Sequence, residues 1–263
     1  MRIPEYELKS GHSMPVLGLG TWQLTGEDCE RTVRQALEIG YTQIDTSDDY
    51  MNEETIGKAL KGFDRSNLFI TSKVDDSKLR EQQVIDACRG SLERLGIEYL
   101  DLYLIHRPNP TVPLEETMEG MEELVEREMV RSIGISNFSI EGTKSASEAS
   151  FLPLSNNQIK IHPYHYPKDA IEFFKARSFV VTAYSPLDTG GIVSDDLLTG
   201  IGERHGKSAA QVSLRWLLQK GLVVIPKSSS REHLEENIDI FDWKLSEEDS
   251  RKIDDVAMKA LRG

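Results

Sequence analysis

Strand-like and helix-like segments alternate along nearly the whole chain, and this alternation limits the folds that it can adopt. The strand-like segments are short apolar runs, which are typical of parallel strands buried on both faces. The helix-like segments carry apolar residues three and four positions apart, and several end at glycine. Strands are expected at 17–22, 41–46, 68–73, 100–106, 130–136, 156–161, 179–185 and 222–226. Helices are expected at 27–39, 53–60, 83–95, 114–127, 141–149, 168–176, 209–219 and 232–238.

Eight strands, each followed by a helix, within 263 residues predict an α/β protein with a (β/α)8 TIM barrel. Two elements are added to it, an N-terminal hairpin at 5–16 and an extra C-terminal helix at 246–260. An open doubly wound sheet is the alternative, but it usually has a glycine-rich first turn. Here Gly18 and Gly20 lack a third glycine at the required spacing, and we interpret them as allowing the backbone to approach a ligand. Since no linker-like stretch occurs, we expect residues 1–263 to form a single barrel domain.

Composition excludes several classes of function. The formal net charge of −13 argues against a nucleic-acid partner and against anionic membrane surfaces. No apolar run could span a bilayer, and the first residues lack the apolar core of a signal peptide. The two cysteines, Cys29 and Cys88, are expected to be reduced, which indicates a cytoplasmic location. Histidines at ligand spacing are missing, so no metal is expected.

Polar residues stand where three consecutive expected strands end. Asp45 ends the second strand, Lys73 the third and His106 the fourth, and Tyr50 follows Asp45 by five residues. The carboxyl ends of barrel strands meet at one face, where catalytic groups gather. Each residue alone has a plain structural explanation, such as a core histidine or a rim lysine. Four such residues at successive strand ends favour a catalytic site.

These four residue types can together donate a proton to a carbonyl oxygen. A tyrosine with its ordinary pKa of about 10 is a weak acid at neutral pH. A neighbouring lysine cation would stabilise the phenolate, and Asp45 would provide the charge partner of Lys73. A histidine N–H could orient the carbonyl oxygen beside the phenol. The pattern therefore predicts a proton-donating site for a carbonyl that receives a hydride, with Tyr50 as the general acid.

The sequence resembles the aldo-keto reductase family in an ordered set of short motifs that runs from about residue 5 to about residue 255. The resemblance implies a (β/α)8 reductase of aldehydes and ketones that uses NADPH or NADH. It also implies that Asp45, Tyr50, Lys73 and His106 form the catalytic set. The matching stretches are 18–22, 44–53, 71–73, 101–106, 133–138, 157–159, 162–164, 183–187 and 225–228.

The resemblance also assigns binding residues. Tyr184 matches the tyrosine that stacks on the nicotinamide, and Lys227 and Ser228 match residues at the adenosine phosphate. The residues that match holders of the carboxamide are Ser136, Asn137 and Gln158. The remaining expected cofactor contacts are Thr21, Trp22, Asp45, Ser185, Leu187, Arg231, His233, Glu236 and Asn237. The expected substrate contacts are Trp22, Tyr50, His106 and Arg107.

The segment after the eighth strand bears on the choice between NADPH and NADH. Ser229 and Glu232 fit a capping box at the start of a helix, whose free N–H groups suit a phosphate. Lys227 adds a charge, which favours NADPH. Where the family usually has an arginine, this chain has His233, and histidine changes its charge near neutral pH whereas arginine does not. We therefore expect a preference for NADPH with measurable use of NADH.

Two other functions are compatible with a barrel. One is a non-catalytic nicotinamide-binding protein with a regulatory or interaction role, because a fold does not determine a function. The other is an isomerase or lyase that binds phosphate, for which Gly190-Gly191 is a weak indication. Arg107 stands where the family often has tryptophan, so the substrate stays open beyond a small carbonyl compound. Oligomeric state is also open, and we expect a monomer.

Overall fold

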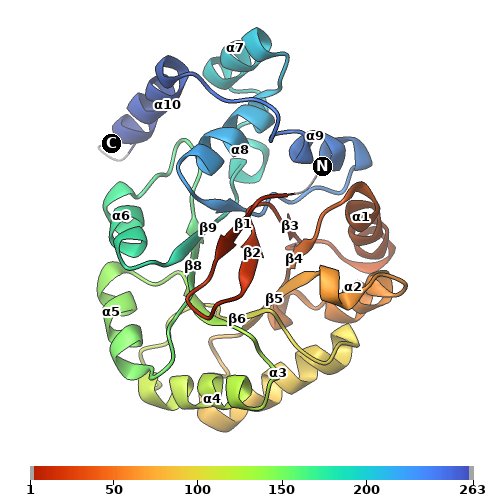
Figure 1. The fold of residues 1–263 in the computed structure, drawn as a ribbon, viewed down its shortest axis with the longest axis vertical. Helices are drawn as coiled ribbons and strands as arrows, with labels where there is room; N and C mark the ends of the chain where they lie inside the picture. Colours follow the sequence, from red (N-terminus) through yellow and green to blue (C-terminus); the bar gives the residue numbers. More distant parts are fainter. Residues whose placement is uncertain (1–2, 261–263) are drawn as a thin grey trace.

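Eight parallel strands form a closed barrel, and helices surround it (Figure 1). The computed structural model describes residues 3–260. Neighbouring strands follow chain order from β3 to β10, and Leu17 pairs in parallel with Val224 to close the ring. The expected barrel is confirmed, and the open doubly wound alternative is wrong. The barrel strands are β3 (Leu19–Gly20), β4 (Gln43–Asp45), β5 (Phe69–Val74), β6 (Leu102–Ile105), β7 (Ile133–Ser136), β8 (Asn156–Lys160), β9 (Val180–Tyr184) and β10 (Val223–Val224).

The helices lie outside the barrel, and at least one follows each of its strands (Figure 1). They are α1 (Gly26–Ile39), α2 (Glu53–Leu60), α3 (Glu81–Leu95), α4 (Leu114–Glu126), α5 (Ile140–Ala149), α6 (Lys168–Ala176), α7 (Asp196–His205), α8 (Ala209–Gln219), α9 (Arg231–Ile238) and α10 (Glu247–Ala260). Short 3-10 helices are η1 (Asp48–Tyr50), η2 (Arg65–Asn67) and η3 (Asp188–Gly190). Helix α1 shows why the pattern was readable: it buries Cys29, Val33 and Ala36 and ends at Gly40 with a φ of 116°.

Helix α7 was not expected from the sequence. It buries only Leu198, Ile201 and Gly202, so its apolar stripe is short. The residues at its two ends indicate a helix more clearly than its buried residues do. Asp195 accepts a hydrogen bond from the backbone of Leu198, and Gly206 ends the helix with a φ of 63°.

The N-terminal hairpin closes the amino end of the barrel. Its strands are β1 (Glu5–Glu7) and β2 (Ser13–Pro15), which pair antiparallel as expected. Figure 1 shows them lying across the centre of the barrel. They contribute to a separate apolar cluster whose buried members are Leu8, Met14, Phe69, Leu102, Leu104 and Val223. The hairpin therefore completes the core at the end where the strands begin.

The two glycines near β3 serve the barrel wall. A Cβ atom on Gly18 would lie 2.7 Å from the side chain of Gln43, and one on Gly20 would lie 2.7 Å from the carbonyl oxygen of Ile225. Both distances are shorter than any ordinary carbon contact, so only glycine fits at either position. Both glycines therefore serve packing within the barrel wall, and the expectation that they let the backbone approach a ligand stays a prediction.

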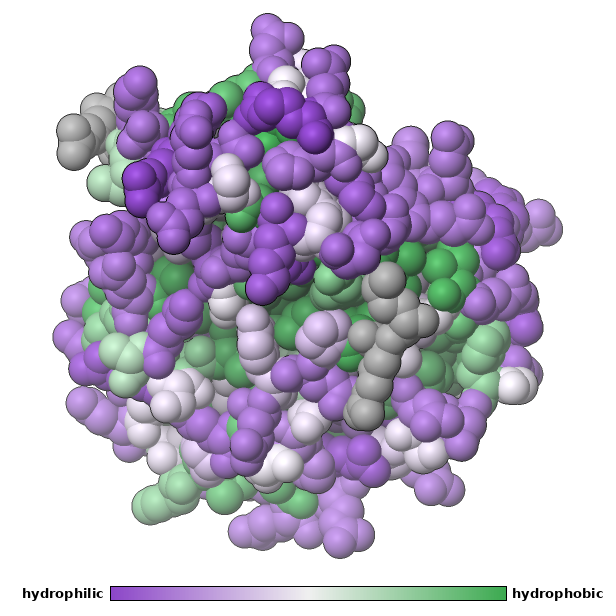
Figure 2. All heavy atoms as spheres, turned by 45° about the horizontal axis from the view of Figure 1, so that its top comes forward, coloured by the Kyte–Doolittle hydropathy of each residue, from purple (hydrophilic) through white to green (hydrophobic). Residues whose placement is uncertain are grey.

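Polar residues cover most of the face shown in Figure 2, and apolar residues are visible mainly in gaps between them. Large apolar side chains are nevertheless exposed at a few positions, including Trp22, Met51 and Phe151. Between residues 3 and 260, no helix is long and apolar enough to cross a membrane.

Candidate active site

Lys73 and Asp45 form a buried ion pair at the carboxyl end of the barrel. Asp45 is the last residue of β4, and Lys73 is the fifth residue of β5. The Nζ atom of Lys73 lies 2.5 Å from Oδ1 of Asp45 and donates to the carbonyl oxygen of Thr46 at 2.8 Å. The Lys73 side chain is fully buried. Burial by itself lowers the pKa of Lys73, but the charge of Asp45 and hydrogen bonds with Asp45 and Tyr50 outweigh it and raise the pKa. Lys73 is therefore a cation at neutral pH.

Tyr50 lies beside this ion pair, at the end of η1. The Nζ atom of Lys73 is 5.1 Å from the centroid of the Tyr50 ring, and the two side chains share a hydrogen bond. Burial raises the pKa of Tyr50, and Asp45 and Asp49 raise it further. Lys73 lowers this pKa, as expected from the sequence, but its effect is smaller than that of burial. The phenol therefore holds its proton at rest, which a proton donor must do.

His106 follows directly after β6, and its ring packs edge-to-face with the ring of Tyr50. The ring centroids are 5.7 Å apart with an interplanar angle of 73°. The Nδ1 atom of His106 lies 3.2 Å from Oγ of Ser47 and 3.3 Å from Oδ1 of Asp49. All four residues of the expected catalytic set therefore lie at one end of the barrel. Ser47 and Asp49 were not expected as site residues, and the only sequence signal for them was their place between Asp45 and Tyr50.

The expected nicotinamide residues form a hydrogen-bonded chain that reaches the ion pair. The amide of Gln158 donates to Oδ2 of Asp45 at 2.7 Å, and Oγ of Ser136 donates to the carbonyl oxygen of Gln158 at 2.8 Å. The Asn137 amide donates to Ser136 at 3.1 Å, and the Tyr184 hydroxyl donates to the Asn137 amide oxygen at 2.9 Å. This chain links β7, β8 and β9 to the catalytic end of β4.

Two residues of this region adopt left-handed backbone conformations. The φ angle of Asn137 is 61° and that of Ser185 is 50°. Such values are uncommon outside glycine and often occur at ligand sites. The side chains of Ser136 and Gln158 are buried, whereas Tyr184, Ser185 and Leu187 are partly exposed.

Thr21 and Trp22 border the catalytic end after β3. The Thr21 hydroxyl donates to the carbonyl oxygen of Asp45 at 2.9 Å, and Trp22 is half exposed. Arg107 is exposed immediately after His106, and its charge acts on Tyr184. Trp22 and Arg107 are therefore exposed beside the catalytic end, and their contact with a substrate stays a prediction.

The expected phosphate end lies at the start of α9. Ser230, rather than Ser229, caps this helix, since its hydroxyl accepts from the backbone N–H of His233. The proposed capping box of Ser229 and Glu232 is wrong because the helix begins one residue later. Ser228 is buried and accepts from the N–H of Ser230 at 3.1 Å.

The side chains around the start of α9 differ in exposure and in whether another residue already pairs with them. Lys227 is exposed and makes no hydrogen bond or ion pair with any residue from 3 to 260. His233 is exposed too. Arg231 is engaged by Glu235 at 2.9 Å and by Glu38 at 3.4 Å. On the next turn, Glu236 is partly exposed and Asn237 is buried. A helix start beside an exposed lysine suits a phosphate group, so these residues fit the adenosine end of NADPH.

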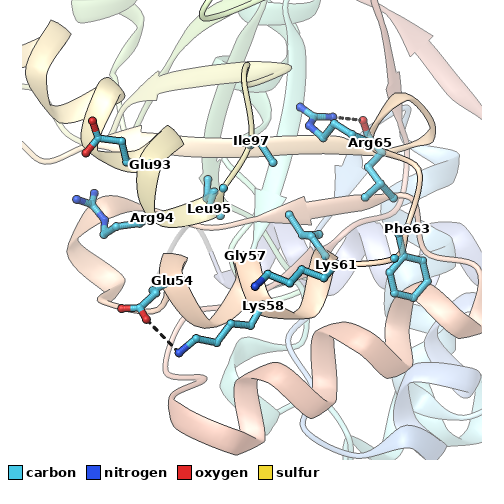
Figure 3. Close-up of a pocket in the computed structure, with 14 residues that line it drawn as sticks. Glu54, Gly57, Lys58, Lys61, Phe63, Arg65, Glu93, Arg94, Leu95 and Ile97 are labelled. Carbon is cyan, nitrogen blue, oxygen red and sulfur yellow. Dashed lines mark hydrogen bonds and ion pairs between the residues drawn. The ribbon is translucent and has the colours of Figure 1, made fainter.

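A separate hollow of about 400 Å³ lies outside the barrel between α2 and α3 (Figure 3). Its lining includes Lys58, Lys61, Arg65 and Arg94 together with two glutamates. Lys58 is paired with Glu54 at 3.0 Å. Because the last turn of α3 precedes β6, this hollow lies toward the amino end of the strands. It contains none of the expected site residues and is distinct from the catalytic end.

A closed (β/α)8 barrel that holds a phenol, an imidazole and a buried lysine–aspartate pair at its catalytic end is suited to reducing carbonyl groups. A sequence profile described as the Aldo/keto reductase family matches residues 16–258. The glyoxal reductase of Bacillus subtilis strain 168 is 39% identical over 251 residues, which cover 94% of this chain and 91% of that protein. The chain therefore belongs to the aldo/keto reductase family. It is an oxidoreductase that reduces carbonyl groups with NAD(P)H.

Solved structures agree with this assignment. An aldo/keto reductase from Brucella melitensis matches with a TM-score of 0.93 at 37% identity, over 97% of this chain and 98% of that one. An aldo-keto reductase from Bombyx mori, solved in complex with NADP, matches with a TM-score of 0.91 at 31% identity, over 97% of this chain and 93% of that one. The family therefore uses NADP(H), and the barrel of this chain has the same architecture.

Proposed function

We propose that Tyr50 donates the proton in carbonyl reduction and that Lys73 and Asp45 make this transfer possible. The observation that carries the proposal is the fully buried Lys73 cation, which contacts both Asp45 and Tyr50. When bound, the nicotinamide supplies a hydride to the carbonyl carbon. As negative charge develops on the carbonyl oxygen, Tyr50 releases its proton to that oxygen. The Lys73 cation then stabilises the phenolate, and its attraction is strong because water is excluded.

His106 is the proposed partner of the same carbonyl oxygen. Its Nδ1 atom is engaged by Ser47 and Asp49, so Nε2 is the ring nitrogen left for a substrate. A donor at Nε2 would orient the oxygen toward the Tyr50 hydroxyl before the proton moves. The short distance between the two rings, 5.7 Å between centroids, supports this arrangement, because both polar groups can then meet one carbonyl oxygen.

NADPH is the proposed cofactor, with NADH as a weaker alternative. Lys227 and the start of α9 offer a positive charge and N–H groups to the additional phosphate of NADPH. Arg231 is engaged by two glutamates, so it contributes less than its position in the sequence suggests. His233 stands exposed in the first turn of α9 and is the proposed second contact to this phosphate.

Small polar aldehydes are the proposed substrates. The relative named glyoxal reductase supports this class, and so does the polar border that Arg107 gives to the entrance. We further propose that residues 1–263 form one domain, which acts as a monomer in the cytoplasm without nucleic-acid or membrane partners. The two cysteines support this location, since both are unpaired and buried.

A steady-state assay tests the reaction and the role of Tyr50 together. Purified protein is mixed with glyoxal or another small aldehyde and with NADPH or NADH, and the loss of reduced cofactor is followed. Wild type should turn over faster with NADPH, whereas Tyr50→Phe should bind NADPH and turn over very slowly. Normal turnover by Tyr50→Phe would remove Tyr50 as the proton donor.

A further inference from the structure

Asn52 lies two residues after Tyr50, and its side chain joins the loop after β3 to the loop after β4. Its Nδ2 atom donates to the carbonyl oxygen of Thr21 at 2.9 Å and to that of Leu24 at 3.0 Å. Its Oδ1 atom accepts from the hydroxyl of Thr46 at 2.7 Å. Asn52 is buried, so water does not compete for these three hydrogen bonds.

The partners of Asn52 require an amide at this position. The carbonyl oxygens of Thr21 and Leu24 can only accept, so the amide nitrogen must face them and the amide oxygen must face Thr46. Helix capping is the plain alternative, because Asn52 precedes α2 and asparagine is common at such positions. Its side chain, however, makes no capping hydrogen bond to the first turn of α2. The amide therefore serves the two loops and not the helix.

The bond between Asn52 and Thr46 bears on the distance between Tyr50 and Lys73. The carbonyl oxygen of Thr46 accepts from Nζ of Lys73 at 2.8 Å. The side chain of the same threonine is bonded to Asn52, so one hydrogen bond closes the loop from 46 to 52 that contains η1 and Tyr50. The loop that carries the phenol is thus closed at the residue that holds the lysine.

Met51 shows that this loop needs to be held. Its φ angle is 56°, in the left-handed region that is uncommon for residues other than glycine. Such a conformation persists where the surrounding structure fixes it. The side chain of Met51 is 87% exposed, so its own packing does not fix the turn. The hydrogen bonds of the adjacent Asn52 do so.

Helix α2 has anchors of its own that do not involve Asn52. The buried carboxylate of Glu53 accepts from the hydroxyl of Ser72 at 2.6 Å and from Nη2 of Arg94 at 2.7 Å. These bonds hold α2 on β5 and α3. Loss of the Asn52 amide should therefore loosen the loop from 46 to 52 and leave α2 in place.

We propose that Asn52 is a positioning residue whose side-chain amide holds the Tyr50 hydroxyl against Lys73. Through Thr21 and Leu24 it also fixes the loop that carries Trp22, so the proton donor and this exposed indole keep one arrangement. This role rests on the proposed function, because Asn52 acts on the reaction only through Tyr50.

Asn52→Asp tests the proposal with little change of shape. Aspartate is as good as asparagine before a helix, but its carboxylate cannot donate to the two carbonyl oxygens that it would face. At saturating NADPH, kcat should fall about 10- to 100-fold, because a small displacement of a reacting group is costly. The solvent deuterium isotope effect on kcat should rise as proton transfer becomes limiting. The Kd for NADPH and the KM for the aldehyde should stay within about twofold of wild type.

Asn52→Ala removes the amide without adding a charge, and kcat should fall in the same direction. A crystal structure of this variant gives a readout that does not depend on turnover. It should show η1 displaced from Lys73 with α2 unmoved. An unchanged loop from 46 to 52, or a wild-type kcat in both Asn52 variants, would overturn the proposal.

A double variant shows whether Asn52 acts through Tyr50. Once Tyr50→Phe has removed the hydroxyl, adding Asn52→Asp should change the remaining rate little, since nothing is left to position. Fully additive losses would mean that Asn52 acts by another route and would also overturn the proposal. An active Tyr50→Phe variant is a different result, because it refutes the proposed function itself.

Gln211 offers the matched control. Its buried amide also donates to two backbone carbonyl oxygens, those of Glu236 at 3.1 Å and Asp239 at 2.8 Å. It lies in α8, which carries none of the proposed catalytic residues. Gln211→Glu should lower the melting temperature while kcat at saturating NADPH stays within about twofold of wild type. Equal losses of kcat in Gln211→Glu and Asn52→Asp would show a general effect of instability and would rule out positioning by Asn52.

Discussion

The two ends of the barrel are built from the same strands but have opposite chemistry. At the amino end, Phe69 of β5 and Leu102 of β6 pack with the hairpin residues Leu8 and Met14. At the carboxyl end, β5 presents Lys73, four residues after Phe69, and His106 follows Leu102 by four residues. Since side chains alternate along a strand, residues two or four positions apart face the same side. One inward face therefore carries both the apolar core and the catalytic groups.

The two ends of the strands therefore have different roles: the amino end stabilises the fold, and the carboxyl end carries the catalytic groups. A buried ion pair such as Lys73–Asp45 contributes little net stability, because both charges must leave water. The apolar cluster at the amino end stabilises the fold without taking part in chemistry. Substitutions at the carboxyl end should therefore change rates, whereas those at the amino end should change the free energy of unfolding.

The largest expected effect is on the rate at the carboxyl end. Tyr50→Phe removes one hydroxyl and should lower kcat about 10²–10⁴-fold, the range typical of general acid catalysis. NADPH affinity and the melting temperature should stay close to wild type. Stopped-flow kinetics, cofactor titration and thermal unfolding measure the three quantities. Tyr99→Phe, at the amino end, is the matched control and should change kcat by less than about twofold.

The next effect belongs to the amino end. Leu102 is fully buried in the apolar cluster, and Leu102→Ala should lower the free energy of unfolding by about 2–5 kcal/mol because it leaves a cavity. The kcat of the folded fraction should change little. Denaturant unfolding and an active-site titration measure the two values. A large loss of kcat with unchanged stability would show that the two ends are not separated in function.

A smaller effect concerns cofactor choice. His233→Arg places a permanent charge in the first turn of α9 and should raise the NADPH to NADH ratio of kcat/KM roughly two- to fivefold. Steady-state kinetics of wild type and variant with both cofactors at neutral pH measures this. An identical ratio in both proteins would mean that His233 does not contact the phosphate.

The smallest effect is on stability at the catalytic end. The pKa of Asp49 lies at about 2 in the fold, below its ordinary value of 3.8, so its contribution to stability is present above about pH 4 and is lost as the pH falls toward 2. Because the side chain is about a third exposed, screening limits this contribution to about 1 kcal/mol at most. Urea unfolding of wild type and Asp49→Asn at pH 6, 4 and 3 should show a difference that shrinks at the lowest pH. A difference that grows there would contradict the assignment.

Features that depend on neighbours in the chain were readable without the structure. Apolar spacing and terminal glycines indicated most helices, and the polar residues at strand ends indicated Asp45, Tyr50, Lys73 and His106. Helix α7 was missed because its apolar stripe is short, although Asp195 and Gly206 marked its ends. The helix cap at Ser230 was placed one residue early, because three consecutive serines offered equivalent signals.

By itself, the sequence determined the order of strands and helices, the family and the residue types at the catalytic end, since local spacing and composition encode all of these. Only the tertiary structure decided which of these residues touch. Asp49 meets His106 across 57 positions of the chain, and Arg231 meets Glu38 across 193 positions. The physical reason is that the closure of the barrel sets such contacts, and strand register brings together side chains whose spacing in the sequence carries no signal.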